Sequence, residues 1–317
     1  MNDETRMESA SPQSRIVCFG GMAWNRKYAL DQRPVLGTSN PASGSEAHGG
    51  VIRNVAENLV RLGVPVCMAS IVGDDAAGRQ LVSSMEALGA ETDAVAVSDT
   101  RPTAEYVAIF DGDNELVLGL ASMDIFDELQ PAALASLWDR LGPDDWVAID
   151  CNIPAETIAA LAERRLRLGF RLAANTVSVS KGNRLCDVLP ELDLLFTNRD
   201  EAIELLGLDG STVPPLEDLL AMLLDRGVRG AVITDGPAGH VTAVNGERFR
   251  TSALARQVVN VSGAGDALMA GILYGLYSGA TPERSSHIGA VLSALTVETD
   301  ADVRPDLTTD SLILDRE

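Results

Sequence analysis

The chain has 317 residues, of which 46% are hydrophobic and 22% are charged, so it can bury a large core as one α/β domain, although length alone also allows two. It carries 46 acidic against 25 basic residues, which gives a formal net charge of −21. Because no block of basic residues is present to neutralise phosphates, we expect neither nucleic acid nor a membrane as a partner.

The N-terminal segment and the cysteines indicate a cytoplasmic protein. Residues 1–14 are polar and lack the apolar centre of a signal peptide, so we expect a disordered tail ahead of a folded domain over residues 15–317. No apolar run reaches the length of a membrane span. The cysteines lie far apart without metal-binding spacing, which indicates reduced thiols in the core; they are Cys18, Cys67, Cys151 and Cys186.

Helical and strand patterns alternate along most of the chain. Continuous apolar runs predict buried strands, and amphipathic stretches that end at glycine predict helices. Alternation of this kind predicts βαβ units and a mainly parallel sheet, with ligands bound beyond the carboxyl ends of the strands. The predicted strands are 16–20, 66–72, 146–149, 171–174, 194–197, 230–234 and 257–259, and the predicted helices are 51–62, 76–88, 154–168, 199–206, 216–226 and 266–277.

Two regions interrupt this alternation. Residues 104–110 and 115–120 alternate as two strands around a turn at 111–114, which predicts a hairpin. Residues 24–45 show no helical pattern. These regions predict either a separate small β element or, for the hairpin, a decoration of the surface.

The most informative stretch is N-V-S-G-A-G-D, which begins at Asn260 and ends at Asp266. The small residues Gly263, Ala264 and Gly265 let successive backbone N–H groups point at one spot, and the helix predicted after them adds its dipole. Such a turn suits an anion. Held there in its ionised form near neutral pH, Asp266 is placed to take a proton from a hydroxyl that attacks phosphorus. An ordinary capped helix start would also produce this local pattern.

Four further motifs occur in a fixed order along the chain: H-G-G-V-I-R-N-V-A from His48, V-G-D-D-A-A-G from Val72, T-N-R-D-E from Thr197 and T-D-G-P-A-G from Thr234. With the G-A-G-D turn, this order resembles the ribokinase-like (PfkB) sugar and nucleoside kinases from residue 15 onward. The resemblance implies a ribokinase-like three-layer α/β sandwich with a small β lid near residues 22–47 and 103–121. In that family the lid covers the sugar and often forms homodimer contacts.

The resemblance also implies residue roles. Asp266 would act as the base, and the amides of Gly263, Ala264 and Gly265 would stabilise the transferring phosphoryl group. ATP and Mg²⁺ are the implied cofactors, with Glu201 organising Mg²⁺ mostly through water. The implied acceptor-binding residues are Asn25, Lys27, Gly49, Gly50, Asn54 and Asn152, and the implied ATP-binding residues are Asn198, Glu201, Thr234, Gly236 and Gly239.

Three asparagines, Asn25, Asn175 and Asn260, stand where an aspartate is expected in this family. An amide still donates to and accepts from a hydroxyl, but it brings no charge. In many relatives the aspartate at the position of Asn260 helps to hold a monovalent cation. We therefore expect little response to K⁺ in this chain.

Within the family, the chain looks most like the pseudouridine kinases. T-S-N-P from Thr38, D-C-N-I from Asp150 and R-P-D-L from Arg304 match segments of that group, as does the asparagine at 260. The resemblance implies phosphorylation of the 5′-hydroxyl of pseudouridine. A kinase for another nucleoside or for a free sugar stays open, as does a non-catalytic sensor that has lost three carboxylates. No P-loop or dinucleotide fingerprint is present.

Overall fold

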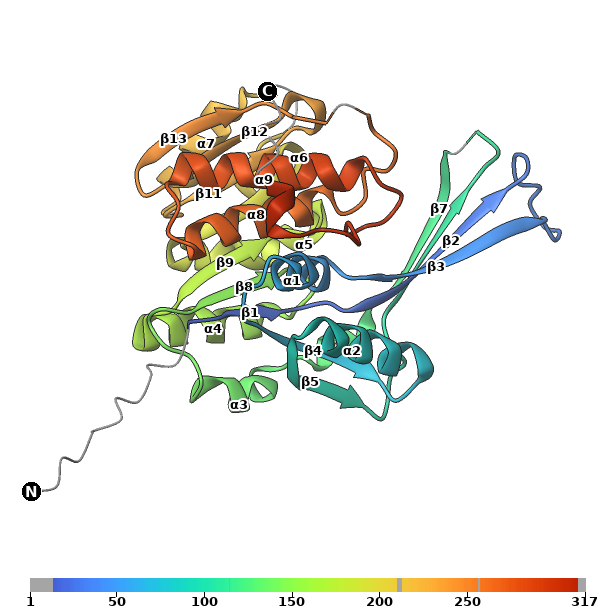
Figure 1. Cartoon of the computed structure of the whole chain (residues 1–317), viewed down its shortest axis with the longest axis horizontal. Helices are drawn as coiled ribbons and strands as arrows, with labels where there is room; N and C mark the ends of the chain where they lie inside the picture. Colours follow the sequence, from blue (N-terminus) through green and yellow to red (C-terminus); the bar gives the residue numbers. More distant parts are fainter. Residues whose placement is uncertain (1–13, 114, 210–212, 256, 313–317) are drawn as a thin grey trace, which may run out of the picture.

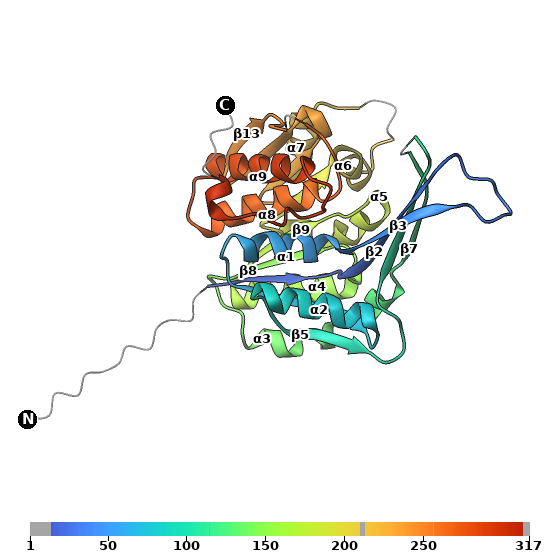
Figure 2. The same cartoon turned by 45° about the vertical axis from the view of Figure 1, so that its right-hand side comes forward.

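The computed structural model describes residues 14–113, 115–209, 213–255 and 257–312. The predicted tail, residues 1–14, lies outside these ranges except for Ser14, whose carbonyl accepts a hydrogen bond from the Tyr277 hydroxyl at 2.6 Å. The described residues form a nine-stranded sheet and a separate four-stranded sheet (Figures 1 and 2). None of the helices within these ranges is both long and apolar enough to cross a bilayer.

The large sheet has the strand order β13-β12-β11-β10-β9-β8-β1-β4-β5. All neighbours from β11 to β5 pair in parallel, and β12 and β13 add an antiparallel edge. The predicted mainly parallel sheet is therefore confirmed. Its strands are β1 (Ile16–Phe19), β4 (Val66–Gly73), β5 (Glu91–Ser98), β8 (Trp146–Asp150), β9 (Arg171–Asn175), β10 (Leu194–Asn198), β11 (Ala231–Thr234), β12 (His240–Val244) and β13 (Glu247–Thr251).

Helices cover both faces of this sheet (Figure 1). In β1, Val17 and Phe19 join one core while Ile16 and Cys18 join the other, because successive side chains of a strand point to opposite faces. Helices α4, α6 and α7 pack on the first core, and α1, α2, α8 and α9 pack on the second. The helices are α1 (Val51–Arg61), α2 (Ala76–Leu88), α3 (Ala135–Trp138), α4 (Ala155–Leu168), α5 (Val179–Gly182), α6 (Arg199–Leu206), α7 (Leu216–Asp225), α8 (Ala264–Tyr277) and α9 (Pro282–Val297).

The second sheet has the order β3-β2-β6-β7 and projects to one side of the helical layers (Figures 1 and 2). Its strands, β2 (Ala23–Leu30), β3 (Ala42–Gly49), β6 (Glu105–Phe110) and β7 (Leu116–Ser122), come from the two segments that interrupt the helical pattern. The predicted hairpin is present as the β6–β7 pair. In its turn, Asp111 accepts hydrogen bonds from the N–H groups of Asp113 and Glu115, both at 3.0 Å; Asn114 lies outside the described residues. The expected three-layer α/β fold with a small second sheet is thus confirmed.

The predicted strand at 257–259 is wrong. These residues form an exposed loop, because the N–H groups of Val259 and Asn260 both donate to the Val297 carbonyl at the end of α9 instead of joining a sheet. The β12–β13 hairpin was not predicted, although its turn is Asn245–Gly246 with φ angles of 52° and 83°. Asn-Gly is the strongest short signal for such a turn. Helix α9 was also missed, because residues all around it are buried and no amphipathic stripe results.

Candidate active site

The first turn of α8 carries the site. Gly263, its N-cap, has φ 75°, and a Cβ on it would lie 1.8 Å from the carbonyl oxygen of Asp302, so no other residue fits there. Helix α8 begins at Ala264, and its first N–H groups have no partner inside the helix. Apart from its chain neighbours and the backbone of α8 itself, no atom of the described residues lies within 4 Å of the position that a Cβ on Gly265 would take. The Ala264 N–H makes only a long hydrogen bond, to the Val261 carbonyl at 3.4 Å, and the start of a helix of this kind suits an anion.

Asp266 lies in this turn and contacts the acceptor-side helix α1. Asn54 Nδ2 donates a hydrogen bond to Asp266 Oδ2 at 2.8 Å. Burial raises the pKa of Asp266 to about 7, and the negative charges of Asp302 and Asp150 add to the rise, while Asn54 and Arg53 oppose it. The expectation that Asp266 stays ionised near neutral pH is thus wrong, since roughly half of it is protonated at its pKa. A base with such a pKa is well matched to proton transfer at neutral pH.

A second buried carboxylate, Asp150, organises the backbone around the residues predicted to bind the acceptor. Its oxygens accept hydrogen bonds from the N–H groups of Gly21 (3.0 Å), Ile52 (3.2 Å) and Asn152 (2.9 Å). Burial raises the pKa of Asp150, and the three N–H donors oppose that rise. Because it joins the ends of β1 and β8 to the start of α1, Asp150 fixes the relative positions of Gly50 and Asn152. Sequence reasoning did not assign it this function.

The predicted acceptor residues on β2 contact the C-terminal segment. Asn25 Nδ2 lies 3.0 Å from Asp302 Oδ2, and Lys27 Nζ lies 3.3 Å from Asp302 Oδ1. Gly49 is required for a packing reason: a Cβ on it would lie 2.3 Å from the amide of Asn25. A Cβ on Gly50 would meet the Gly21 carbonyl at 2.2 Å. The structure therefore brings Asn25, Lys27, Gly49 and Gly50 together where β2 and β3 meet α1.

Asn152 is held by a residue that sequence reasoning missed. Lys181, in α5, donates from Nζ to Asn152 Oδ1 at 2.6 Å, and the Asn152 side chain is in turn hydrogen-bonded to the Asp150 carboxylate. Burial lowers the pKa of Lys181. Lys27 and Lys181 are the two lysines among the 25 basic residues of the chain. Lys27 contacts Asp302 and Lys181 contacts Asn152.

The residues predicted to bind ATP line two adjoining cavities. A cavity of about 170 Å³ is bounded by Asn198, Glu201, Thr234, Gly265 and Asp266, together with Val51, Asn175, Val177, Phe196, Thr197, Val232 and Leu268. An apolar cavity of about 410 Å³ shares Thr234 and Gly265 with it. Gly236 and Gly239 line the larger cavity and do not line the smaller one.

Asn198 and Glu201 both cap α6. Asn198 Oδ1 accepts the Glu201 N–H at 2.9 Å, and the Glu201 carboxylate accepts the Asn198 N–H at 3.2 Å, which makes a capping box. The Glu201 carboxylate also accepts from the Thr176 hydroxyl. The ordinary helix-start explanation of these residues is therefore correct, and the same side chains also line the smaller cavity with Asp266.

Val177, which lines the smaller cavity, has a strained backbone. Its φ is 65°, a left-handed value that a β-branched residue rarely adopts. Its N–H donates to Asn175 Oδ1 at 2.8 Å. Strain of this kind persists where the surroundings hold it and is common at functional sites. Asn175 is thus used to shape the β9–α5 connection.

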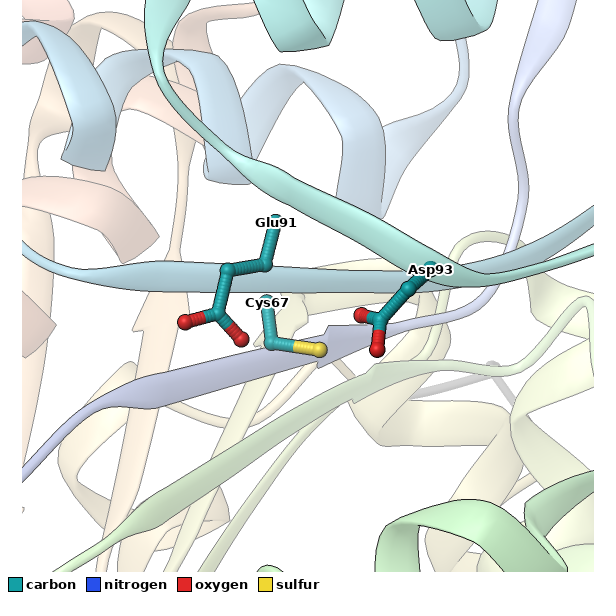
Figure 3. Close-up of side chains that lie close together, drawn as sticks. All are labelled: Cys67, Glu91 and Asp93. Atoms are coloured by element: carbon teal, nitrogen blue, oxygen red, sulfur yellow. The ribbon is translucent and has the colours of Figure 1, made fainter.

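A cluster far from these cavities has side chains of metal-binding type. Cys67 of β4 lies between the carboxylates of Glu91 and Asp93 of β5 (Figure 3). Arg140 donates to Glu91 at 2.5 Å and to Asp93 at 2.6 Å, and burial raises the pKa of Cys67 to about 11. Arg15 also pairs with Glu91, at 3.1 Å. The two carboxylates are thus neutralised by two guanidinium groups and the thiol stays protonated, so this group is an ion-pair network. Cys18 and Cys151 are also buried, whereas Cys186 is exposed, contrary to the prediction that all four cysteines lie in the core.

Comparison with known proteins shows the family and agrees with the fold. Residues 13–308 match the pfkB family carbohydrate kinases. The pseudouridine kinase of Escherichia coli K12 is 28% identical over 235 residues, which are 74% of each chain. A carbohydrate kinase from Agrobacterium tumefaciens superposes with a TM-score of 0.83 at 30% identity, over 95% of this chain and 96% of its own. An Arabidopsis thaliana ribokinase complexed with ribose and ATP shares the fold, with a TM-score of 0.81 at 20% identity over 95% and 97% of the two chains.

Proposed function

The chain belongs to the pfkB family of carbohydrate kinases, and we propose that it transfers the γ-phosphoryl group of ATP to the 5′-hydroxyl of a nucleoside, with pseudouridine as the preferred acceptor. The observation that carries this proposal is the position of Asp266. It has a pKa near 7, lies in the anion-binding turn of α8 and contacts Asn54 on the acceptor side. The similarity to the E. coli pseudouridine kinase and the motifs shared with that group support the acceptor.

In the proposed reaction, Asp266 accepts the proton of the acceptor hydroxyl. The hydroxyl oxygen forms a bond to the γ-phosphorus as the bond from phosphorus to the bridging oxygen breaks, and ADP leaves. The amides at Gly263, Ala264 and Gly265 stabilise the charge on the transferring group. The acceptor is held by the set that meets around α1, namely Asn25, Lys27, Gly49, Gly50, Asn54 and Asn152.

We assign the phosphates and the adenosine part of ATP to the two different cavities. The smaller cavity contains Asn198, Thr234 and Asp266, so we place the phosphates there. The larger, apolar cavity suits the adenine ring; Gly236 and Gly239 line it, and we therefore assign them to the nucleoside end of ATP.

One carboxylate of this site, that of Glu201, is suited to hold a magnesium ion. Glu201 lines the smaller cavity and binds protein donors through Oε2. A single carboxylate beside phosphates is a usual setting for Mg²⁺, which keeps several of its waters. When bound, the ion would neutralise charge on the phosphates. Glu201 would hold it mostly through water.

The second sheet has an exposed apolar strand that we assign to dimerisation. Leu116, Leu118 and Leu120 of β7 are all about half exposed. Leu118 and Leu120 lie on one face, because they are two residues apart in the regular part of the strand. A second copy of the chain would cover this face and hold the sheet as a lid over the acceptor. We place the enzyme in the cytoplasm, where Cys18, Cys67 and Cys151 would remain reduced.

A panel of acceptors tests the proposal. Purified protein is incubated with ATP and Mg²⁺ and with pseudouridine, uridine, guanosine, inosine, ribose or fructose, and the phosphorylated product is quantified; Asp266→Asn protein controls for contaminating kinases. We expect the highest kcat/KM for pseudouridine. Preference for another nucleoside or a free sugar would overturn the acceptor assignment. Binding of an acceptor without any phosphorylation would indicate a sensor and overturn the proposal as a whole.

A further inference from the structure

Asp302 has a place in the site that none of the sequence motifs indicates. Its side chain is 7% exposed, and it lies in the segment that follows α9. That segment brings the carboxylate to the acceptor side, where Asn25 and Lys27 of β2 contact it at 3.0 and 3.3 Å. Two parts of the chain that are far apart in sequence, β2 and the C-terminal segment, therefore meet at this one carboxylate.

The donors around Asp302 leave part of the hydrogen-bonding capacity of its carboxylate unused. A carboxylate accepts about four hydrogen bonds, and the described residues supply two side-chain donors, the Asn25 amide and the Lys27 ammonium. Burial of a carboxylate costs free energy unless donors satisfy it. Vicinal hydroxyls of a sugar are donors of the required kind. The Asn25 amide, which bonds Asp302, also packs directly against Gly49.

Asp302 is also close enough to the reacting groups to affect them. Its negative charge contributes to the raised pKa of Asp266, so the two carboxylates share one poorly solvated space. Its backbone carbonyl lies against Gly263, the N-cap of α8. The same residue thus contacts the acceptor side through its side chain and the anion-binding turn through its backbone.

We propose that Asp302 binds the sugar hydroxyls of the acceptor and supplies the carboxylate that Asn25 does not. This rests on the proposed function. Asn25 and Lys27 orient the Asp302 carboxylate, and the sugar hydroxyls donate to its remaining lone pairs. The negative charge of the sugar site therefore comes from the C-terminal segment, and the acceptors selected are those with free hydroxyls on the ring.

Exchanging the carboxylate and the amide between positions 25 and 302 tests whether Asp302 binds the acceptor. The variants are Asp302→Asn, Asn25→Asp and the double exchange, each assayed with ATP and the best acceptor of the panel. For Asp302→Asn we expect the acceptor KM to rise about tenfold to a hundredfold, which is typical of a lost charged hydrogen bond, with the KM for ATP unchanged. The double exchange returns the carboxylate to the site and should recover most of the acceptor affinity.

Asp306→Asn is the matched control, because Asp306 lies in the same segment, is exposed and pairs with Arg304; it should behave as wild type. The competing explanation is that the Lys27–Asp302 ion pair only holds β2 against the C-terminal segment. In that case Asp302→Asn would lower the Tm without a selective change in acceptor KM, and the proposal would be wrong. It would also be wrong if the double exchange were as impaired as Asp302→Asn. The acceptor-induced rise in Tm provides a second readout if any variant turns over too slowly.

The outcome is separable from that of the proposed function. If wild-type protein phosphorylates no acceptor of the panel, the function itself fails. If it phosphorylates an acceptor whose KM is the same in wild type and in Asp302→Asn, the function stands and the assignment of Asp302 fails. Asp302→Glu, which keeps the charge but moves it by one methylene, replaces Asp302→Asn if that variant does not fold.

Discussion

Asp266 accepts a side-chain hydrogen bond from Asn54, while burial and two neighbouring carboxylates, Asp302 and Asp150, disfavour its charge. The balance of these effects places its pKa at about 7. A carboxylate with an ordinary pKa would be ionised but a weak base at neutral pH. Asp266 is therefore a better base, at the cost of being partly protonated.

Asp266→Asn removes the base and keeps its shape. We expect kcat to fall by about a hundredfold to ten-thousandfold, the usual worth of general base catalysis, with a much smaller change in ATP affinity. Steady-state kinetics and ATP binding measured on the folded variant test this. Turnover close to wild type would rule out Asp266 as the base.

The pH dependence of kcat/KM follows from the same group. The base acts in its deprotonated form, so below its pKa of about 7 kcat/KM should fall about tenfold for each pH unit, and above it should level off. The midpoint should move to lower pH in Asp302→Asn, because that change removes a negative charge that disfavours ionised Asp266. A profile that is flat from pH 5 to pH 8, a range of about three units across the expected pKa, would contradict the assignment.

At the scale of elements, the second sheet and the loop before α8 are the parts that we expect to respond to ligands. Strands β2 and β3 carry predicted acceptor-binding residues at their ends nearest α1, whereas β7 is exposed along its whole length. The loop at 257–263 borders the apolar cavity through Val258 and Val261. Neither element has the buried apolar packing of the main sheet.

Acceptor binding should order the β6–β7 hairpin, because a kinase has to exclude water from the reacting phosphate. We expect slower amide exchange over residues 104–120 in the presence of pseudouridine and a nonhydrolysable ATP analogue. Residues 216–225, in α7, serve as the internal control. Unchanged exchange over 104–120 at saturation would show that the hairpin does not act as a lid.

The loop before α8 is held by Asn260 without a charge. Asn260 Oδ1 accepts the Ser262 N–H at 3.0 Å, and Nδ2 donates to the Asp300 carbonyl at 3.2 Å. An aspartate at this position would add an attraction on the order of 1–4 kcal/mol for a cation a few ångströms away. We therefore expect kcat to respond little when K⁺ replaces a large organic cation at constant ionic strength. A strong, saturable activation by K⁺ would contradict this, and Asn260→Asp is the variant in which activation should appear.

At the scale of the whole molecule, the site exists because the parallel strands end at one edge of the sheet. Residues at or after the ends of β9, β10 and β11 line one cavity there with the turn of α8. The second sheet extends beyond this edge (Figure 2), so its apolar face stays uncovered within a single chain. A partner chain is the natural cover for a face of this kind.

The assembly prediction follows from that face. We expect wild-type protein to sediment as a dimer and Leu118→Asp to sediment as a monomer with weaker acceptor binding. Leu166→Asp, at an exposed leucine of α4 outside the second sheet, is the matched control and should remain a dimer. A wild-type monomer at micromolar concentration would contradict the assignment of β7 to an interface.

Local sequence patterns were sufficient to predict much of the fold of this protein. Apolar runs and glycine-terminated amphipathic stretches predicted most central strands and the helices beside them, because strands covered on both faces and helices that pack on one face leave clear periodicities. The G-A-G-D turn and the motifs after β10 and β11 were readable for the same reason: their geometry depends on residues adjacent in sequence. The β12–β13 hairpin was readable too, from Asn245–Gly246, but was overlooked.

What the tertiary structure decided depends on contacts between distant residues. The pKa of Asp266 results from burial beneath α1 and from charges at 150 and 302, and the position of Asp302 beside Asn25 spans 277 residues of sequence. The loop at 257–259 has the apolar pattern of a strand, yet its N–H groups are taken by the end of α9. The periodicity of apolar residues shows which face of a helix or strand is buried. The solvation and charge of a side chain in the site depend instead on the residues that the fold packs against it. Those contacts decided the pKa of Asp266 and the position of Asp302.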